Sequence, residues 1–216
     1  MVVELNRSNS VANHFLAEMR DVGVQKDPMR FRRNLERMGE VFAYELSKTL
    51  AYAEQEVASP LGVARMMLPA EQPVLCTILR AGLPLHQGLL NYFDRADNAF
   101  VSAYRKHRKG EDGFDVEVEY LSSPSIEDRV LIISDPMLAT GRSMALVYKA
   151  MLRMGKPKAV HVVSVIASNE GVEFAQRHFP ANTYFWLGAV DSEMTAEAYI
   201  VPGLGDAGDL AYGNKI

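Results

Sequence analysis

The sequence contains a single cysteine, Cys76, among its 216 residues, so no disulfide can form within the chain. One cysteine is typical of a protein from a reducing compartment. Cys76 lies inside an apolar run, where a thiol is usually an inert part of the core. No histidine stands where the sequence would mark it as a partner of this thiol, which argues against a catalytic cysteine.

Long hydrophobic segments are also missing. The longest strongly apolar run, residues 159–167, is interrupted by His161 and Ser164 and is far too short to cross a bilayer. The first ten residues, MVVELNRSNS, include Glu4 and have no apolar core, unlike a signal peptide. We therefore expect a cytoplasmic protein with no membrane contact.

Basic residues are fewer than acidic ones. The chain has 23 Lys and Arg against 27 Asp and Glu, a net charge of −4. This argues against a nucleic-acid partner, because a broad nucleic-acid surface needs an excess of positive charge. The one local basic cluster consists of Lys26, Arg30, Arg32, Arg33 and Arg37. It is either a solvated helix face or a patch for an anionic effector or a partner subunit.

Several common catalytic motifs are absent as well. The chain has no GxxxxGK[ST] and no GxGxxG sequence, so the two common nucleotide-binding loops are excluded. Its five histidines show no metal-ligand spacing. No Ser/His/Asp signature is present either, so nothing marks a nucleophilic side chain.

The elements that the sequence does indicate suit one α/β domain, with 48% hydrophobic and 23% charged residues. Residues from about 11 to 52 have the pattern of helices, with Asp27 as an N-cap and Pro28 at the first helical position. A link to the next region is punctuated by Pro60, Gly62, Pro69 and Pro73.

From residue 74 strands and helices alternate. The predicted strands are 74–79, 99–104, 130–134, 159–167 and 183–190, and the predicted helices are 84–92, 143–154 and 170–178. Residues 104–121 have the pattern of a hairpin arm or flap. This order predicts a mainly parallel sheet with helices on both faces and ligands outside the carboxyl ends of the strands. We divide the single domain, 1–216, into a helical part (about 1–70), an α/β core (about 71–190) and a C-terminal loop region (about 191–216).

The most informative motif is VLIISDPMLATGRS at residues 130–143. Its four leading apolar residues predict a buried strand that ends at Ser134 and Asp135. The loop then passes through Thr140 and Gly141 into a helix, whose unpaired N–H groups and dipole favour an anion. Since a carboxylate does not attract a second anion, Asp135 indicates sugar hydroxyls or a metal-linked phosphate.

Two basic motifs precede this loop. ILRAG at 78–82 places Arg80 at a strand end, where the guanidinium and the N–H groups beside two small residues can hold a pyrophosphate. YR at 104–105 is followed by the basic run KHRK, and such an arm can close over a reacting ligand and exclude water. Each motif is also compatible with an ordinary surface loop.

A glycine-rich motif, AYIVPGLGDAGD, occupies residues 198–209. A mobile tail is one interpretation, but the apolar residues Tyr199, Ile200, Val201 and Leu204 are unusual for disorder. A rigid loop that presents backbone N–H and C=O groups can instead recognise a flat base. The two carbonyls and intervening N–H of a pyrimidine suit such a loop.

Taken together and in this order, the motifs resemble the uracil phosphoribosyltransferases, a family of type I phosphoribosyltransferases. DPMLATG is similar to the family's phosphoribosyl diphosphate (PRPP) loop, ILRAG to its pyrophosphate loop and YIVPGLGDAGD to its uracil loop. The resemblance covers nearly the whole chain. It implies a mainly parallel sheet flanked by helices, with a β-arm and an N-terminal helical extension, and the transfer of phosphoribosyl from PRPP to uracil to give UMP and diphosphate.

The resemblance also implies roles for single residues. Asp135 would hold the ribose hydroxyls and stabilise developing positive charge, Arg105 would contact the pyrophosphate, and Asp206 would reach both uracil and the magnesium side of PRPP. The implied substrate-binding residues are Arg80, Ala81, Gly82, Arg105, Asp135, Pro136, Met137, Leu138, Ala139, Thr140, Gly141, Arg142, Ser143, Tyr199, Ile200, Gly205, Asp206 and Ala207.

The implied cofactor is Mg2+, bound through PRPP near Asp206 and not at a protein metal site of its own. Family members are commonly dimers or tetramers, and some bacterial members are activated by GTP. The implied partners are therefore PRPP, uracil, GTP as an effector, and further copies of the chain.

Two positions depart from the family pattern. Arg142 stands where a glycine is usual, and Leu210 replaces a usual arginine. We expect an arginine at position 142 to be compatible with phosphate binding, because main-chain N–H groups hold the phosphate. Two other hypotheses are a phosphoribosyltransferase for a purine or orotate, and a catalytically inactive sensor of PRPP or nucleotides. The uracil-type loop argues against the first, and the presence of Asp135 and Arg80 argues against the second.

Overall fold

The computed structural model describes residues 1–107 and 114–214, and it describes side chains outside residues 103–117. Its centre is one sheet in the order β1-β10-β9-β7-β4-β5-β6, with β8 beside β9. The strands are β1 (Val2–Glu4), β4 (Val74–Leu79), β5 (Asp97–His107), β6 (Phe114–Ser122), β7 (Val130–Ser134), β8 (Met137–Leu138), β9 (Ala159–Ser168) and β10 (Tyr184–Asp191). All neighbours pair in parallel except β5 and β6. The mainly parallel sheet that the sequence predicts is thus confirmed.

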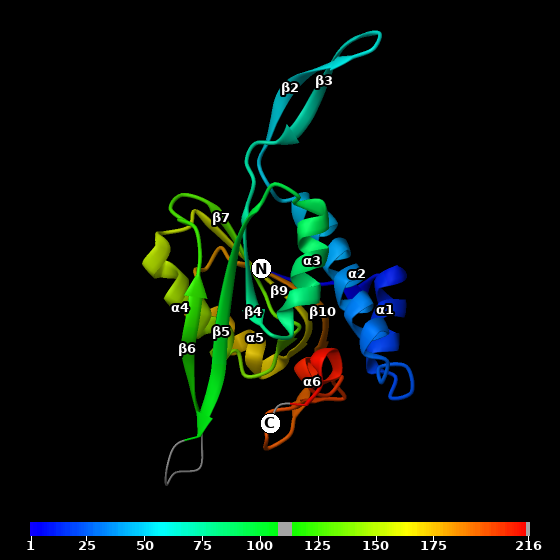
Figure 1. Cartoon of the computed structure of the whole chain (residues 1–216), viewed down its shortest axis with the longest axis vertical. Helices are drawn as coiled ribbons and strands as arrows, with labels where there is room; N and C mark the ends of the chain where they lie inside the picture. The colour runs from blue at the N-terminus through cyan, green and yellow to red at the C-terminus, as the bar shows by residue number, and fades with distance from the viewer. Residues whose placement is uncertain (108–113, 215–216) are drawn as a thin grey trace.

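Helices cover both faces of this sheet (Figure 1). On one side lie α1 (Val11–Arg20), α2 (Pro28–Ser47) and α3 (Gly82–Tyr92), and on the other α4 (Arg142–Met151) and α5 (Asn169–His178). Two apolar clusters fill the two interfaces, one around Phe31 and Phe42 and one around Phe179 and Phe185. Burial on both faces explains why β7 and β9 are nearly continuous apolar runs.

Short elements complete the chain and adjust the predicted boundaries. They are the 3-10 helices η1 (Leu5–Arg7) and η2 (Leu152–Met154), the pair β11 (Glu193–Met194) and β12 (Ile200–Val201), and α6 (Ala207–Tyr212). The predicted N-cap is confirmed, since the Asp27 side chain accepts from the N–H groups of Met29 and Arg30. The helix expected over 143–154 is α4 followed by η2. Within the described residues no helix is long and apolar enough to cross a membrane.

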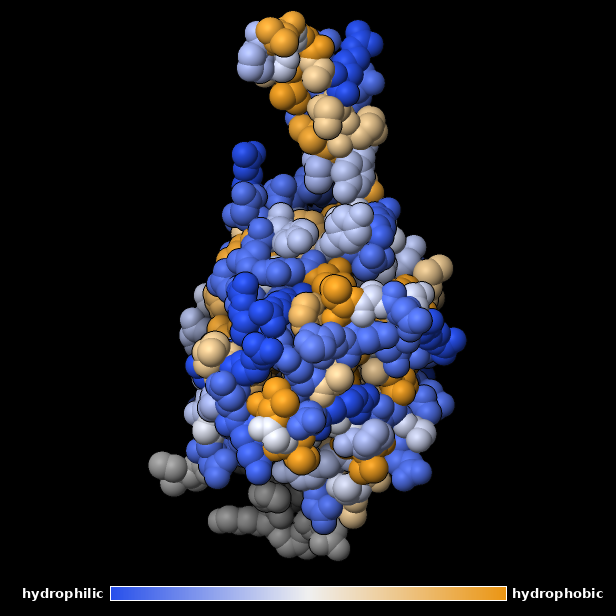
Figure 2. All heavy atoms as spheres, turned by 90° about the vertical axis from the view of Figure 1, so that its right-hand side faces the viewer, coloured by the Kyte–Doolittle hydropathy of each residue, from blue (hydrophilic) through white to orange (hydrophobic). Residues whose placement is uncertain are grey.

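The segment after α2 differs from the expectation. Where the sequence predicts the end of a helix and a punctuated link, the chain forms an antiparallel hairpin of β2 (Tyr52–Ser59) and β3 (Gly62–Pro69). The hairpin projects from the body, and Figure 2 shows its hydrophobic and hydrophilic atoms side by side in the open. Every side chain of β2 is exposed. Because neither face is buried, the sequence carries no alternation from which to predict these strands.

The arm expected over residues 104–121 is confirmed in part. β6 pairs antiparallel with β5, and Tyr104 lies opposite Glu117 in the register. The tip of the arm, including Arg108 and Lys109 of the basic run, lies outside the described residues. Arg105 lies in β5, but its side chain is outside the described part of the structure.

Candidate active site

A cavity of about 850 Å³ lies at the carboxyl ends of β4 and β7. Residues from four segments line it, namely Ile78, Leu79, Arg80 and Ala81; Ser102; Asp135, Met137, Leu138, Ala139, Thr140, Gly141, Ser143 and Met144; and Ala198, Tyr199, Gly205, Asp206, Ala207, Gly208 and Asn214. Three of the four motifs that the sequence indicates, at residues 78–82, 130–143 and 198–209, therefore meet around one space. A cavity of this size suits a small-molecule substrate.

The loop after β7 leads the backbone into the first turn of α4. Gly141 caps α4 with φ +73°, a left-handed conformation that favours glycine. A Cβ at this position would also lie 2.7 Å from the Gly171 carbonyl oxygen. The Arg142 N–H faces the Thr140 hydroxyl oxygen at 3.5 Å. The result is a helix N-terminus whose free N–H groups open toward an anion.

β9 and α5 hold this loop from behind, and it is this contact that the sequence did not indicate. The Pro136 carbonyl accepts from the N–H groups of Val165 and Ile166. The Ser168 hydroxyl donates to the Ala139 carbonyl at 2.6 Å and accepts from the Gly171 N–H at 2.9 Å. The first turn of α5 therefore fixes the height of the loop above the sheet.

The loop after β4 carries Arg80. The Arg80 guanidinium donates to the Gly213 carbonyl at 3.2 Å and lies 3.6 Å from an Asp209 carboxylate oxygen. Gly82 starts α3 where no side chain fits, because a Cβ there would lie 2.1 Å from the Thr77 hydroxyl. That hydroxyl faces the Ser134 carbonyl at 3.4 Å, so the ends of β4 and β7 are joined beneath the cavity.

The C-terminal motif is ordered around its glycines. Gly203 and Gly205 have φ values of +56° and +89°, and Asp206 then caps α6 by accepting from the N–H groups of Gly208 at 2.8 Å and Asp209 at 3.0 Å. Ile200 is 3% exposed and packs in the core. The mobile-tail interpretation does not hold for this segment.

Most of the residues that the resemblance singled out line the cavity. Among those whose side chains the structure describes, four, Gly82, Pro136, Arg142 and Ile200, do not. Gly82, Pro136 and Ile200 are buried behind it, whereas the Arg142 side chain is exposed. Asp135 lines the cavity half-buried, and its N–H donates to the Val163 carbonyl at 3.1 Å.

Two arginines that hold the C-terminal segment were missed. Arg20 makes two parallel bonds of 2.8 Å to the Asp191 carboxylate, and Arg32 donates to the Ala211 carbonyl at 2.6 Å. In the structure the basic cluster is divided among several contacts within the chain. Its arginines have separate partners: Arg30 with Glu18, Arg33 with Glu36, Arg37 over Phe15, and Arg32 with the Ala211 carbonyl.

Other chemical candidates are weaker. Cys76 is fully buried, and burial raises its pKa to about 12, so its thiol is inert as expected. Within the part of the chain that the structure describes, no three His, Cys, Asp or Glu side chains are grouped to hold a metal ion.

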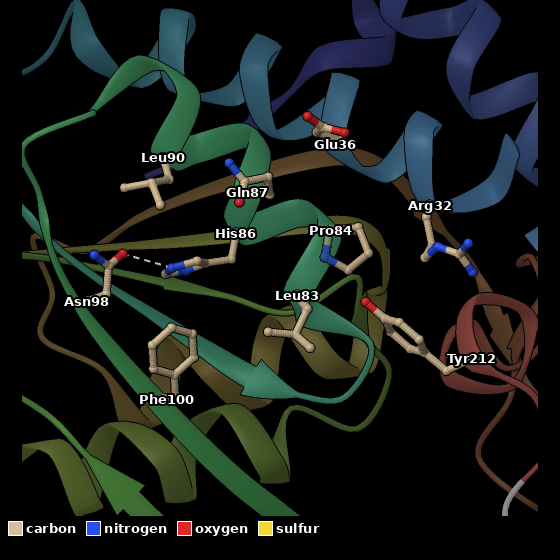
Figure 3. A pocket seen from close by; sticks show the side chains of 10 residues that line it. All are labelled: Arg32, Glu36, Leu83, Pro84, His86, Gln87, Leu90, Asn98, Phe100 and Tyr212. Carbon is tan, nitrogen blue, oxygen red and sulfur yellow. Dashed lines mark hydrogen bonds between the residues drawn. The ribbon is translucent and has the colours of Figure 1, made fainter. Parts of the chain in front are cut away.

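A second cavity, of about 500 Å³, lies between α2, α3, β5 and α6 (Figure 3). His86 points from α3 across to Asn98, which accepts from its Nε2 at 2.8 Å while donating to the Ala96 carbonyl. Burial lowers the pKa of His86, so the ring is neutral near pH 7. None of the residues implied for the substrates whose side chains the structure describes lines this space, although Arg32 and Tyr212 at its edge belong to the contacts that hold α6.

Comparisons with known proteins agree with the motifs. A family model described as uracil phosphoribosyltransferase matches residues 6–214. A uracil phosphoribosyltransferase of Porphyromonas gingivalis is 55% identical over 215 residues, which are 100% of this chain and 99% of that protein. One from Methanothermobacter thermautotrophicus is 37% identical over 95% of this chain and 93% of its own length.

Solved structures confirm the architecture. The AQ2163 protein of Aquifex aeolicus superposes with a TM-score of 0.87 at 29% identity, with full coverage of both chains. A hypoxanthine phosphoribosyltransferase of Staphylococcus aureus reaches a TM-score of 0.50 at 15% identity over 76% of each chain. The second likeness shows the fold alone.

Proposed function

Because this chain belongs to the uracil phosphoribosyltransferase family, we propose that its larger cavity transfers the 5-phosphoribosyl group of PRPP to uracil, releasing diphosphate and forming UMP. The observation that carries this proposal is the meeting of the three motif loops around one cavity of about 850 Å³. The carboxylate, the helix N-terminus and the guanidinium there suit the ribose, the 5′-phosphate and the diphosphate respectively.

The 5′-phosphate would lie on the loop from Thr140 to Ser143, where N–H groups and hydroxyls converge at the start of α4. The main chain makes this site, so the exposed Arg142 side chain is compatible with it. Fixing the phosphate also fixes the ribose, so that its anomeric carbon stands ready for the uracil nitrogen.

Asp135 would hold the ribose hydroxyls. As diphosphate leaves, positive charge develops on the sugar, and a carboxylate beside it stabilises that state more than the ground state. Arg80 at one wall and Arg105 on β5 would take the negative charge of the leaving group. Uracil would lie against the backbone of Gly205, Asp206 and Ala207, with Tyr199 at its edge.

The donor set of the cavity fits Mg2+ carried by the substrate. The carboxylates of Asp135 and Asp206 line the space. Mg2+ prefers oxygen ligands and usually takes only one or two of them from the protein. Bound with PRPP, the ion supplies neutralisation of the diphosphate charge.

The test is diphosphate release from PRPP and Mg2+ with uracil, in parallel with cytosine, orotate, hypoxanthine and adenine. We expect turnover with uracil alone, and Asp135→Asn should lower kcat by about a hundredfold through the lost charge stabilisation. Tight PRPP binding without turnover of any base would favour the sensor instead. Turnover with a purine or orotate would reassign the base.

Three wider proposals follow from family membership. GTP is proposed as an activator, which the same assay tests by its addition. A homodimer or homotetramer is proposed, which sedimentation tests. The chain is proposed to act in the cytoplasm. Residues 1–216 are proposed to form one domain, so that proteolysis and unfolding should show a single transition.

A further inference from the structure

The C-terminal segment that lines the cavity is held at both ends by arginines of the N-terminal helices. Arg20 of α1 holds it at Gly203, and Arg32 of α2 holds it at Ala211. Between these two points lie Gly205, Asp206 and Ala207, which line the cavity. Neither arginine lines the cavity itself, so any influence on the substrate passes through the backbone of the segment.

At Gly203, hydrogen bonds join Arg20, Asp191 and the glycine backbone to one another. The Arg20 guanidinium grips the Asp191 carboxylate through two bonds of 2.8 Å and also donates to the Gly203 carbonyl at 2.9 Å. The Gly203 N–H in turn donates to Asp191 at 2.9 Å. Both polar groups of this glycine are therefore fixed by one ion pair, in which the Asp191 side chain is 9% exposed.

The hold at Ala211 uses the other end of the segment. Arg32 donates to the carbonyl of Ala211 in the last turn of α6, where a helix leaves its carbonyls unpaired. Its guanidinium also lies 5.8 Å from the centre of the Tyr212 ring, and Figure 3 shows the two side chains side by side at the edge of the second cavity. Charge-assisted and planar contacts of this kind fix geometry as well as adding energy.

We propose that Arg20, Asp191 and Arg32 are positioning residues for the base, which set the place of the Gly205–Ala207 backbone without touching substrate. This inference rests on the proposed function. The phosphate loop is anchored separately, by β9 and by Ser168 at the start of α5. Loss of an arginine contact should therefore disturb uracil binding more than PRPP binding, which involves this segment through Asp206 and through the contacts of Arg80 with Gly213 and Asp209.

The chain offers a matched control. Arg30 of α2 makes the same kind of two-bond contact as Arg20, with Glu18 of α1 at 2.9 and 2.6 Å, but its bonds do not reach the C-terminal segment. Arg30→Lys therefore removes an equivalent fork from the same helices. Lysine keeps the charge in each case, but it cannot supply the two parallel bonds of Arg20 and Arg30 or the planar guanidinium that Arg32 places near the Tyr212 ring.

The experiment measures steady-state kinetics of diphosphate release for the full chain and for Arg20→Lys, Arg32→Lys, Asp191→Asn and Arg30→Lys. We expect KM for uracil to rise by about tenfold in the first three, as one lost charge-assisted contact predicts, with a clearly smaller rise, of about threefold or less, in KM for PRPP. Arg30→Lys should leave both constants within about twofold.

The outcomes separate the two proposals. If the unmodified chain releases no diphosphate with uracil, the proposed function fails. If it turns over uracil but the two lysine variants at Arg20 and Arg32 keep its KM for uracil, the positioning inference is overturned. An equal rise of KM for uracil and for PRPP also overturns it, because a general loss of structure would do the same. Should Asp191→Asn not fold, the two lysine variants decide alone.

Discussion

Replacement of Gly171 by alanine tests how the phosphate loop is supported. Gly171 lies in the first turn of α5, behind the loop and outside the cavity lining. An added Cβ would stand 2.2 Å from the Ala139 carbonyl oxygen and 2.4 Å from that of Leu138. Real Cβ atoms essentially never come closer than 3.0 Å to such atoms, so the Ala139 carbonyl has to move by about 0.8 Å, or α5 has to tilt.

That shift is large for a substrate-positioning loop. A displacement of about 1 Å can lower a rate by about a hundredfold, and overpacking of this kind destabilises a protein by about 1–3 kcal/mol. We expect kcat/KM for PRPP to fall by about two orders of magnitude in Gly171→Ala, with a lower melting temperature. Glu170→Ala, at the exposed neighbouring position in the same turn, is the control and should match the unmodified chain.

The assay is initial-rate diphosphate release over a range of PRPP concentrations at saturating uracil, with thermal melting alongside. If Gly171→Ala keeps KM for PRPP and its melting temperature, α5 does not abut the loop as described, and the steric reasoning is refuted. If only the melting temperature falls, the contact is real but the loop position tolerates it.

Further predictions concern buried groups. Burial lowers the pKa of His161 to about 4; since the unfolded chain binds this proton near pH 6.5, stability is full above that pH and falls by about 2 kcal/mol from pH 7 to pH 5. Urea unfolding followed by the fluorescence of Trp186, the only tryptophan, should show that loss of stability. His161→Asn retains an acceptor for the Trp186 N–H and should lose correspondingly less stability between pH 7 and pH 5. If stability falls equally with pH in both proteins, the loss does not come from His161. Cys76 should react with a thiol reagent only in denaturant, and labelling of the native protein would disprove its burial. Gly82→Ala should weaken PRPP binding, because a Cβ would displace the Thr77 hydroxyl. Adding Thr77→Ser keeps that hydroxyl but frees its rotation, so the double variant should regain part of the lost PRPP binding in the diphosphate-release assay.

The central sheet was predictable because its signals are local. β7 and β9 are apolar runs bounded by polar loops, and strands buried on both faces have that pattern. The three motifs were visible for the same reason, since each spans only a few consecutive residues. The place where they meet also followed, because the carboxyl ends of parallel strands share one edge.

What the sequence did not reveal depends on distance along the chain or on missing burial. The bond between Arg20 and Asp191 joins residues 171 positions apart, and no pattern within α1 marks its partner. The role of Gly171 depends on the approach of α5 to a loop that precedes it by about thirty residues in the chain. The β2–β3 hairpin was missed because a strand with both faces in solvent has no alternation to detect.

The pairing of β1 with β10 has a consequence for how the chain matures. Val2, Val3 and Glu4 lie beside Phe185, Trp186 and Leu187, so β1 is synthesised well before β10, the strand with which it pairs. Contacts of such long sequence separation form slowly, because the chain loses the entropy of closing a long loop before the contact stabilises it. The same holds for Arg20 and Arg32, whose partners lie at the far end of the chain. We therefore expect a nascent chain to remain without a base site until the segment from Asp191 to Ala211 has been released, however early the phosphate loop has folded.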